Sequence, residues 1–540
     1  MDPLLTPPIL TCRQAADFEK GFFGGDEGRE WSAMQAAGAA IAAAVARDGL
    51  EAGHGWERAR VLALVGKGNN GGDAITAVQT LLAAWPQAAA DLVFAFGERS
   101  LKPLAARAWQ NLQQAGRGRV RVVQAGGAGW TGEPRYDLSL DGIFGFQFRP
   151  PLPAEAAAVL RKANALEVRL RAAVDLPSGL GDPHAFRADF TYATGSVKAE
   201  AVEQGNAGRI RYLDLGFFGG GSDVPALDRV LTAGILAPLA GLRPAWGDKR
   251  TYGHVFILGG SRSYPGAVLM NVMAALHSGV GLVTAFVPES LAAAYAARAP
   301  EAIWVGWPET PQGGLAWEGR HLLLERLARA NAIALGSGMA RAPETLALVK
   351  EVAATAGLPV LVDGDALQPE VIEAAAGPLL LTPHAGEFAR IAGGAPLREY
   401  CARTGATVIL KGPVTRVCSG LTAGGGRKRE AQAAGLRVYH SFFGGPILAR
   451  GGSGDVLAGL AAGQLAMLAA EATHPAKPAL PAREGSRADP PAADWPPPLR
   501  AACRAAVWHG LAADALAQSR GQTAATVTGL IDHFPAVLRR

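Results

Sequence analysis

Residues 60–73 read RVLALVGKGNNGGD, and this stretch decides how the first half of the chain is expected to fold. Residues 60–65 are a short apolar run, which is typical of a buried strand. A glycine-rich loop follows and leads into an Ala- and Leu-rich helical pattern that starts near Asp73. A strand, a glycine loop and a helix in this order begin a βαβ unit, which predicts an open and mostly parallel sheet.

The same alternation continues on both sides of this stretch. In the first half, DLVFAFG, RVRVVQA, YDLSLDGIFG, RAAVDLPSG and RIRYLDLG are strand candidates separated by helical patterns. After a glycine-rich break near Gly216, the pattern restarts with HVFILGGS, LVTAFVP, NAIALGSGM, PVLVDGDAL, PLLLTPH and ATVILKG. The break predicts a boundary at about Gly219 to Pro225, and hence domains at 1–220 and 225–540. Because the halves share no sequence repeat, we expect two different α/β folds.

Composition narrows the function classes. The 540 residues carry a formal net charge of +5, with acids and bases interspersed and no basic stripe, so we expect no nucleic-acid partner. The four cysteines are far apart, which favours reduced thiols over a disulfide or zinc site. The N-terminus lacks a basic segment before an apolar core, and the apolar stretch from Gly266 is interrupted by Asn271 and two glycines. The stretch from Gly266 therefore predicts a buried helix, a turn and a strand. Together with the N-terminus, it predicts a cytoplasmic protein without a membrane span.

One segment interrupts the second half. Residues from about 474 to 498 read HPAKPALPAREGSRADPPAADWPPP. Prolines at this density exclude regular structure, and the apolar content is low. We expect a disordered or extended surface loop, followed by a helix that packs back on the second domain.

Polar residues gather at the expected strand ends of the first domain. Asn69, Asn70 and Asp73 lie in the glycine loop, and Asp141, Asp175 and Ser178 end later strands. A turn alone would explain the glycines, and each aspartate alone could cap a helix. Because strand ends share one edge of such a sheet, Asn70, Asp141 and Ser178 could converge as oxygen ligands of a hard cation.

These motifs resemble the NAD(P)H-hydrate epimerase family over most of residues 10–217. GNNGGD, D-x-x-F-G, D-x-P-S-G and ADFTYATGSVK (188–198) occur in the family's order. The resemblance implies a Rossmann-like, doubly wound domain that binds potassium through Asn70, Asp141 and Ser178. It also implies Asp175 as the acid/base that inverts C6 of the reduced nicotinamide ring. The implied contacts to the hydrated dinucleotide are Asn69, Asn70, Gly71, Gly72, Asp73, Gly145, Phe146, Gln147, Phe148, Arg149, Pro150, Pro151 and Asp175.

The second domain has its own glycine-rich helix start. Residues 451–455 read GGSGD and precede a long apolar helical run. Backbone N–H groups at such a start form an anion hole, and Asp455 in the first turn is placed to take a proton from a hydroxyl. A glycine loop with a capping aspartate is the alternative. Lys411 follows an expected strand and suits a nucleotide phosphate. His384 lies in TPHAGE just past another strand, where a buried structural histidine is the alternative.

From about Leu231 onward the chain resembles the ADP-dependent NAD(P)H-hydrate dehydratase family. KRTYGHVFILGGS, AIALGSGM, PVLVDGDAL, TPHAGE, LKG and GGSGDVLAG occur in its order. The resemblance implies a ribokinase-like fold, with ADP as co-substrate and Mg²⁺. Contacts to the hydrated dinucleotide would come from Ala267, Gly338, His384 and Asp455. Contacts to the adenine nucleotide would come from Lys411, Gly412, Pro413, Val414, Thr415 and Gly454.

Several positions depart from the family patterns. Ala74 stands where the epimerase family usually has glycine, and SAMQAAG near Met34 keeps only part of its pattern. In the second half, GDKR (247–250), Asp363-Gly364-Asp365 and Gly444-Gly445 replace the usual residues.

The two resemblances together predict repair of hydrated NADH and NADPH. The first domain would interconvert the R and S hydrates. In the second domain, Asp455 would deprotonate the C6 hydroxyl of the S hydrate. The hydroxyl oxygen then attacks the β-phosphate of ADP, after which phosphate leaves and NAD(P)H reforms. The alternative is a ribokinase-like small-molecule kinase fused to a non-catalytic Rossmann-like binding module. An NAD-dependent dehydrogenase fits less well, because GNNGGD is not the G-x-G-x-x-G fingerprint. A homo-oligomer is compatible with the sequence.

Overall fold

The structure, a computed structural model, describes residues 6–53, 55–126, 135–219, 224–421, 433–473 and 495–539. The chain divides into two compact units. The first comprises Met1–Val230 with Ala517–Ala524, and the second comprises Leu231–Leu516 with Ala525–Arg540. Residues 220–223 of the expected boundary and 474–494 of the Pro-rich stretch lie outside the described residues.

The first unit is built on a parallel sheet. Within its described residues, seven strands run in the order β4-β3-β2-β5-β6-β7-β9, and every neighbouring pair is parallel. Their bounds are β2 (Arg60–Val65), β3 (Ala89–Phe94), β4 (Val120–Val122), β5 (Tyr136–Gly142), β6 (Val168–Val174), β7 (Phe190–Thr194) and β9 (Arg209–Leu213). Because β3 and β5 lie on opposite sides of β2, the order reverses there, which is where ligands bind in such sheets.

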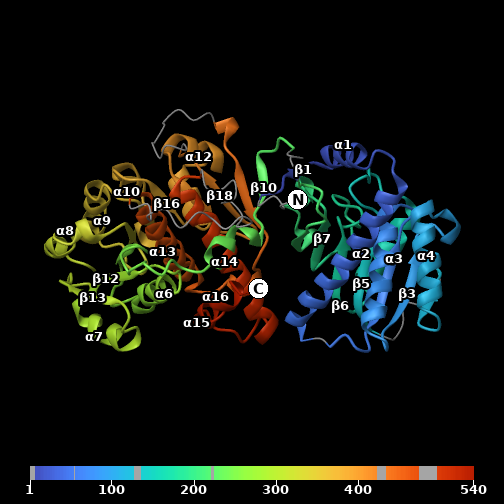
Figure 1. Ribbon diagram of the computed structural model, residues 1–540, viewed down its shortest axis with the longest axis horizontal. Coiled ribbons are helices and arrows are strands. Elements are labelled where there is room, and N and C mark those ends of the chain that lie inside the picture. Colours follow the sequence, from blue (N-terminus) through green and yellow to red (C-terminus); the bar gives the residue numbers. More distant parts are fainter. Residues whose placement is uncertain are drawn as a thin grey trace. The chain divides into compact units, whose positions relative to one another are not determined.

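Helices cover both faces of this sheet. Val61, Ala63 and Val65 of β2 pack in one apolar cluster with α2 (Glu27–Gly49), α3 (Asn69–Ala84) and α4 (Pro103–Ala115). Leu62 and Leu64 point the other way and pack with α5 (Ala154–Ala165). The alternation follows from the two-residue period of a strand that is buried on both faces. The predicted doubly wound Rossmann-like fold is confirmed, and α2, α3 and α4 are seen beside the strands in Figure 1.

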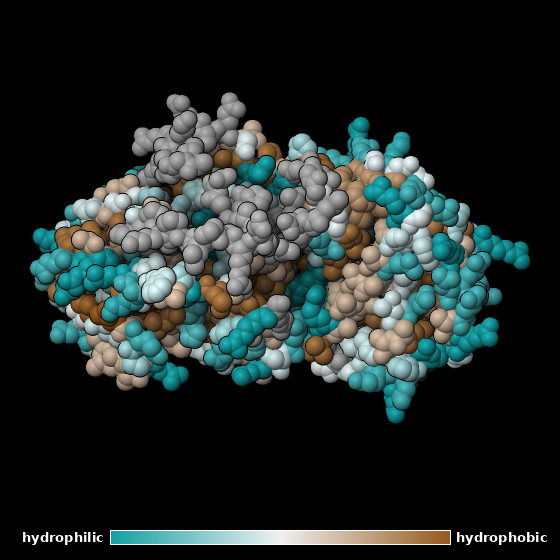
Figure 2. Space-filling view, viewed as in Figure 1, coloured by the Kyte–Doolittle hydropathy of each residue, from teal (hydrophilic) through white to brown (hydrophobic). Residues whose placement is uncertain are grey.

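A further helix, α1 (Cys12–Phe23), precedes this core. It starts with a capping box in which the Thr11 hydroxyl accepts from the Gln14 N–H, and the Gln14 side chain accepts from the Thr11 N–H. Before it, β1 (Ile9–Leu10) pairs in parallel with β8 (Val197–Lys198). At the end of the unit's main segment lies β10 (Asp228–Val230). In Figure 2 hydrophilic residues cover much of the visible outer surface of this unit.

The second unit contains a larger mixed sheet. Its strands follow the order β19-β18-β17-β16-β15-β14-β11-β12-β13. All neighbours from β17 to β13 are parallel, whereas β18 is antiparallel to both of its neighbours, β17 and β19. The bounds are β11 (His254–Leu258), β12 (Leu282–Pro288), β13 (Ile303–Trp307), β14 (Ala332–Leu335), β15 (Val360–Val362), β16 (Leu379–Leu381), β17 (Thr407–Leu410), β18 (Thr415–Ser419) and β19 (Val438–Ser441). The two sheets have different strand orders, as the sequence predicted.

The helices of the second unit also lie on both faces. One apolar cluster joins the sheet to residues of α9 (Pro343–Thr355), α10 (Pro369–Ala374), α11 (Ala385–Ala392) and α12 (Leu397–Thr404). Elsewhere α6 (Pro265–Leu276) packs on α13 (Ser453–Thr473), which contacts β11 and β14. The remaining helices are α7 (Glu289–Arg298), α8 (Arg320–Leu324), α14 (Pro497–Arg520), α15 (Thr528–Ile531) and α16 (Phe534–Val537).

Two sequence expectations concern these helices. The apolar stretch from Gly266 is a helix, a turn and the buried strand β12, as predicted. By length and composition α13 could cross a membrane, but 78% of its apolar window is buried inside the structure, as in a core helix. The helix expected after the Pro-rich loop begins at Pro497, so Pro497 and Pro498 are helical rather than part of the loop. Proline is favoured at the first helical position because its missing N–H would have no partner there.

Candidate active sites

The glycine-rich loop after β2 turns directly into α3. This helix begins at Asn69, one turn earlier than the sequence suggested, and its first internal bond runs from the Gly72 N–H to the Gly68 carbonyl at 3.1 Å. Glycine is needed in that turn, because a Cβ on Gly71 would lie 2.3 Å from the Gly66 carbonyl oxygen. A Cβ on Gly66 would in turn lie 1.8 Å from the Ile143 carbonyl oxygen. The loop therefore packs tightly against the end of β5.

Asp141 and Ser178 meet at that strand end. Both are fully buried, and the Ser178 hydroxyl and N–H each donate to the Asp141 carboxylate at 2.7 Å. The Phe144 N–H donates to Ser178 Oγ at 2.8 Å. Burial raises the pKa of Asp141 to about 6, against the lowering effect of the hydrogen bonds from Ser178 and Ile143.

Asn70 lies at the start of α3, close to the segment that follows β5. A Cβ on Gly145 would lie 3.1 Å from Asn70 Oδ1 and 3.3 Å from Asp175 Oδ2. The Asn70 amide nitrogen is buried without a hydrogen-bond partner. The predicted cation ligands are thus contributed by three neighbouring strand ends, those of β2, β5 and β6.

Asp175 forms a buried ion pair with Lys198. The Lys198 ammonium contacts Asp175 Oδ1, and both side chains are almost fully buried. Lys198 also donates to the Ser196 carbonyl at 3.1 Å and lies 4.8 Å from the centre of the Phe146 ring. Asp175 has φ of 64°, an uncommon conformation for a residue with a side chain, and its Oδ2 accepts from the Phe146 N–H at 3.3 Å.

A cavity of about 870 Å³ opens over these residues. Of the expected dinucleotide contacts, it is lined by Asn69, Asn70, Asp73, Gly145, Phe146, Gln147, Phe148, Arg149, Pro151 and Asp175. Gly71, Gly72 and Pro150 are not among the residues that line it. The two glycines are buried in the turn of α3, so their place is in the packing of the loop.

Two acidic residues that line the cavity, Glu19 and Asp73, are affected by the charges of the Asp175–Lys198 ion pair. Burial raises the pKa of Glu19 to about 7; Lys198 lowers this pKa, and the charges of Asp175 and Glu30 raise it. Burial, followed by the charges of Asp175 and Glu19, also raises the pKa of Asp73. The sequence pointed to neither Glu19 nor Lys198 as a site residue. Lys198 lies within the quoted segment 188–198, but Glu19 carried no motif that could have identified it.

The second candidate site lies at the start of α13. The helix begins at Ser453, within GGSGD, and the Ser453 hydroxyl donates to the Leu448 carbonyl at 2.6 Å. Gly452 has φ of 93°, which lets the chain turn into the helix, and a Cβ there would lie 2.4 Å from the end of the Met270 side chain. The N–H groups of the first helical turn have no partner within the helix and can bind an anion.

Asp455 lies in this first turn, in an environment that favours its protonated form. Burial and the negative charge of Asp363 raise the pKa of Asp455 to about 6. A hydrogen bond from the Ser337 side chain and the charge of Lys411 act in the opposite direction. Ser337 in turn accepts from the Asn271 side-chain amide at 2.9 Å. A carboxyl group with such a pKa can exchange a proton near neutral pH.

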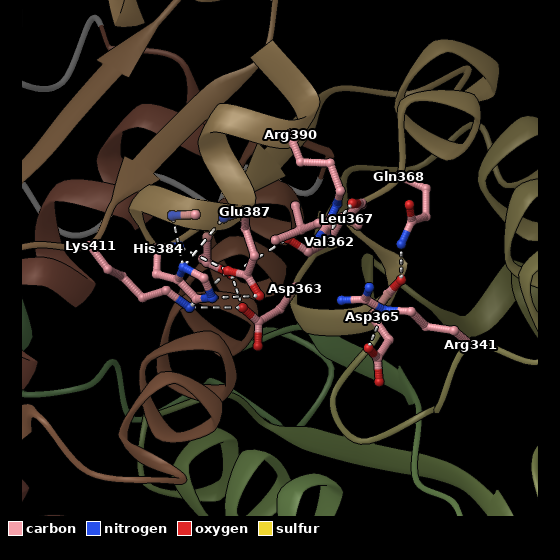
Figure 3. A network of polar contacts seen from close by, with 12 residues as sticks. Arg341, Val362, Asp363, Asp365, Leu367, Gln368, His384, Glu387, Arg390 and Lys411 are labelled. Atoms are coloured by element: carbon pink, nitrogen blue, oxygen red, sulfur yellow. Dashed lines mark hydrogen bonds and ion pairs between the residues drawn. The ribbon is translucent and has the colours of Figure 1, made fainter. Parts of the chain in front are cut away.

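Lys411 pairs with acidic residues that follow two other strands, and it lies close to the first turn of α13. Its ammonium lies 3.2 Å from Asp363 Oδ1 and 3.9 Å from Glu387 Oε2 (Figure 3). A Cβ on Gly454 would lie 3.1 Å from Lys411 Nζ. Gly412, Pro413 and Val414 connect Lys411 to β18, which starts at Thr415. Asp363 was noted in the sequence only as a departure from a pattern, and the structure brings it into the site.

His384 caps α11 and has a largely exposed side chain. Its Nδ1 accepts from the Gly386 N–H at 3.0 Å and the Glu387 N–H at 3.3 Å, and its side chain is 61% exposed. The alternative of a buried structural histidine is therefore wrong. A Cβ on Gly338 would lie 2.8 Å from Ala267 Cβ, so these two expected contacts adjoin each other.

Among the described residues, no group of three or more His, Cys, Asp and Glu side chains is arranged to hold a metal ion. The Asn70, Asp141 and Ser178 set contains one carboxylate and is a different kind of donor set. All four cysteines are free thiols.

Comparisons with known proteins agree with this geometry. The family model described as YjeF-related protein N-terminus matches residues 32–200, and the model described as NAD(P)H-hydrate dehydratase matches residues 255–535. The bifunctional NAD(P)H-hydrate repair enzyme Nnr of Moorella thermoacetica is 32% identical, covering 89% of this chain and 87% of its own length. The enzyme of the same name from Gloeobacter violaceus is 35% identical, covering 80% of this chain and 84% of its own length.

Among solved structures, an ADP/ATP-dependent NAD(P)H-hydrate dehydratase from Bacillus subtilis, co-crystallised with ATP and Mg²⁺, is 25% identical. It covers 55% of this chain and 93% of its own chain, with a TM-score of 0.41. With both family models matched in order and full-length relatives above 30% identity, the chain belongs to the family of bifunctional NAD(P)H-hydrate repair enzymes, with an epimerase part followed by a dehydratase part.

Proposed function

We propose that residues 1–220 interconvert the R and S hydrates of NADH and NADPH, and that residues 225–540 dehydrate the S hydrate with ADP. The observation that carries this proposal is that each half holds its own set of buried ionisable groups at the carboxyl edge of its own sheet. One set surrounds Asp175 and Lys198, and the other surrounds Asp455 and Lys411. The family membership gives the two reactions.

In the first half, Asn70, Asp141 and Ser178 would hold a potassium ion. These side chains fit the group, because amide, hydroxyl and carboxylate oxygens lie at three neighbouring strand ends, and Ser178 Oγ lies 2.7 Å from Asp141 Oδ1. Such oxygens are the ligands that hard cations prefer. When bound, potassium would supply positive charge beside the cavity that we assign to the hydrated dinucleotide.

Asp175 would act as acid and base at C6 of the hydrated nicotinamide ring. Lys198 holds the Asp175 carboxylate from one side, which leaves Oδ2 on the side of Phe146 and the cavity. The dinucleotide would contact the side chains of Asn69, Asn70 and Asp73 in the cavity and the backbone of the loop between them. It would also contact the segment Gly145 to Pro151. We therefore assign the 870 Å³ cavity to the whole reduced nicotinamide end of the substrate.

In the second half, Asp455 would take the proton from the C6 hydroxyl of the S hydrate. The hydroxyl oxygen attacks the β-phosphorus of ADP, and the bond from that phosphorus to the bridging oxygen breaks, which releases AMP. The C6–O bond then breaks as phosphate leaves with the electron pair, and transfer of the C5 proton to water restores the double bond. The N–H groups at Gly452 to Gly454 and the Lys411 ammonium would stabilise the charge on the transferring phosphoryl group.

The remaining contacts follow from this placement. Ala267, Gly338 and His384 would contact the hydrated dinucleotide, and Gly412 to Thr415 with Gly454 would contact the nucleotide. Mg²⁺ would enter with the ADP phosphates, as it commonly does in nucleotide sites, and would neutralise their charge. We also propose a cytoplasmic location, where free thiols such as these four persist.

The test is incubation of the purified chain with separated R and S hydrates, with and without ADP, followed by nicotinamide absorbance and chromatography. We expect the S hydrate to give NAD(P)H only with ADP, with AMP and phosphate formed in equal amounts. The R hydrate should be consumed after conversion to S. A phosphorylated product that accumulates without NAD(P)H would instead indicate the kinase. Dehydration of the S hydrate, without R/S exchange faster than the uncatalysed exchange, would indicate that the first half is a binding module without catalysis.

A further inference from the structure

We propose that His509 is a positioning residue of the dehydratase site, which holds the peptide between Ser453 and Gly454 so that the Gly454 N–H faces the phosphoryl group. The inference rests on the proposed role of the α13 start in phosphoryl transfer. It adds a residue from α14, far along the chain from the GGSGD motif.

The contact is a hydrogen bond from one buried helix to the first turn of another. His509 is 6% exposed, and its Nε2 lies 3.1 Å from the Ser453 carbonyl oxygen. A carbonyl oxygen only accepts hydrogen bonds, so Nε2 must carry the proton and donate. The contact therefore defines the tautomer as well as the position of the ring.

The geometry of a peptide plane gives this contact its consequence. The Ser453 carbonyl and the Gly454 N–H belong to the same planar trans peptide and point in opposite directions. An imidazole that holds the carbonyl therefore also sets the direction of the N–H. This N–H lies in the first turn of α13, where it has no helical partner. Gly454 also faces Lys411, because its Cβ position lies 3.1 Å from that ammonium.

His509 acts through its geometry rather than its charge. Burial, together with the nearby positive charge of Lys411, lowers the pKa of His509 to about 4, against the raising effect of the hydrogen bond to Ser453. The ring is consequently neutral at physiological pH. A neutral donor can orient the peptide without changing the net charge beside the phosphates, and preorganised donors of this kind are the main source of transition-state stabilisation at anion holes.

The neighbours of His509 keep α14 from shifting away from the loop. A Cβ on Gly510 would lie 2.7 Å from Phe443 Cβ, so this turn of α14 packs closely on the segment that leads to the loop. The Trp508 indole N–H donates to the Phe534 carbonyl at 3.0 Å, which fixes the helix from the other side. The Ser453 peptide is therefore held by a rigid element.

The test compares His509→Leu, which removes the donor, with His509→Gln, which retains an N–H donor of similar reach. Should the leucine variant not fold, His509→Met replaces it, because methionine adapts to irregular cores. Cys503→Ala is the matched control, since Cys503 is also buried on α14. Steady-state kinetics with S hydrate and ADP, epimerisation by the same samples, and thermal melting are measured together.

We expect the leucine or methionine variant to lose kcat by about tenfold or more, with a smaller change in KM for ADP. Glutamine should restore most of kcat, and epimerisation should stay unchanged. The inference is overturned if the variant without a donor keeps its kcat, or if the glutamine variant has no higher kcat than that variant. It is also overturned if kcat falls only in proportion to the melting temperature, in the same way as in Cys503→Ala. Asp455→Asn separates the two levels: an inactive Asp455→Asn beside a fully active leucine variant refutes only the role of His509, whereas an active Asp455→Asn refutes the proposed site.

Discussion

The ammonium of Lys411, at the end of β17, lies 3.2 Å from the carboxylate of Asp363, at the end of β15. Thr382 directly follows the intervening strand β16, and its hydroxyl donates to the same Asp363 oxygen at 2.7 Å. The ends of β15 and β17, which are not neighbouring strands, are thus joined by this ion pair (Figure 3). Asp363 thus holds the Lys411 ammonium close to Gly454, in the first turn of α13.

Lys411→Met should lower dehydratase kcat/KM for ADP by about 100-fold or more, because the phosphoryl group loses its cationic partner. Lys411→Arg should recover part of the loss. Lys350→Met is the matched control, since Lys350 is an exposed lysine on α9 of the same unit. Initial rates at varied ADP provide the measurement. Equal rates for the Lys411 and Lys350 variants would remove Lys411 from the nucleotide site.

Asp455→Asn should abolish dehydration and leave epimerisation intact. The substitution keeps the size of the side chain but removes the base, and such a loss typically costs about 10²–10⁴-fold in rate. Asp532→Asn, at an exposed aspartate of the same unit, serves as control. Both activities are followed in one sample with the two hydrates. Near-normal turnover of the S hydrate by Asp455→Asn would contradict its role as the base.

The pH dependence of dehydration should report Asp455. The base must be ionised, and its pKa is about 6, so the rate should fall as the pH drops through about 6. The Ser337 hydrogen bond stabilises the ionised form. Ser337→Ala should therefore raise the pKa of Asp455 and move the acid limb of the kcat/KM profile to higher pH. Ser290→Ala, at an exposed serine, should leave the limb in place. An unshifted limb in Ser337→Ala would show that Asp455 does not set it.

Asp175→Asn should stop R/S interconversion and leave dehydration of the S hydrate unaffected. Asparagine tolerates the left-handed backbone found at this position, so the test changes charge rather than conformation. Lys198 then remains buried without its carboxylate, which should cost about 3–5 kcal/mol of stability. Adding Lys198→Met should restore the melting temperature but not epimerisation. Glu167→Gln is the exposed control. Chromatography that still shows catalysed equilibration in Asp175→Asn would exclude this residue.

Shortening the Pro-rich stretch should leave both activities nearly unchanged. The sequence predicted a dispensable loop from about 474 to 498, but α14 begins at Pro497 and the Trp495 ring lies 4.7 Å from that of Tyr439. Residues 474–494 should therefore be replaced by a short Gly/Ser linker, because loop closure depends only weakly on length. Dehydratase kinetics and circular dichroism test the result. A large rise in KM for ADP with intact ellipticity would show that the segment covers the nucleotide site.

Much of both sites could be predicted because it depends on local order along the chain. Apolar periodicity predicts the strands, and the rule that parallel strands end at one edge predicts that Asn70, Asp141, Asp175 and Ser178 lie near one another. The start of α3 was missed by one turn, because the glycines of GNNGGD indicate a loop locally. In the structure these glycines lie in the first turn of α3, where a Cβ on Gly71 would lie 2.3 Å from the Gly66 carbonyl oxygen.

The sequence by itself determined the two α/β halves, the polar residues at their strand ends and the glycine-rich helix starts, because each depends on residues adjacent in the chain. Only the tertiary structure decided which side chains pair. Lys198 reaches Asp175 through the register of β8 and the end of β6, Asp363 reaches Lys411 across β16, and His509 reaches Ser453 from 56 residues away. Such contacts depend on strand order and helix packing, and no local pattern of residues encodes the distance between two segments that are brought together only when the core forms.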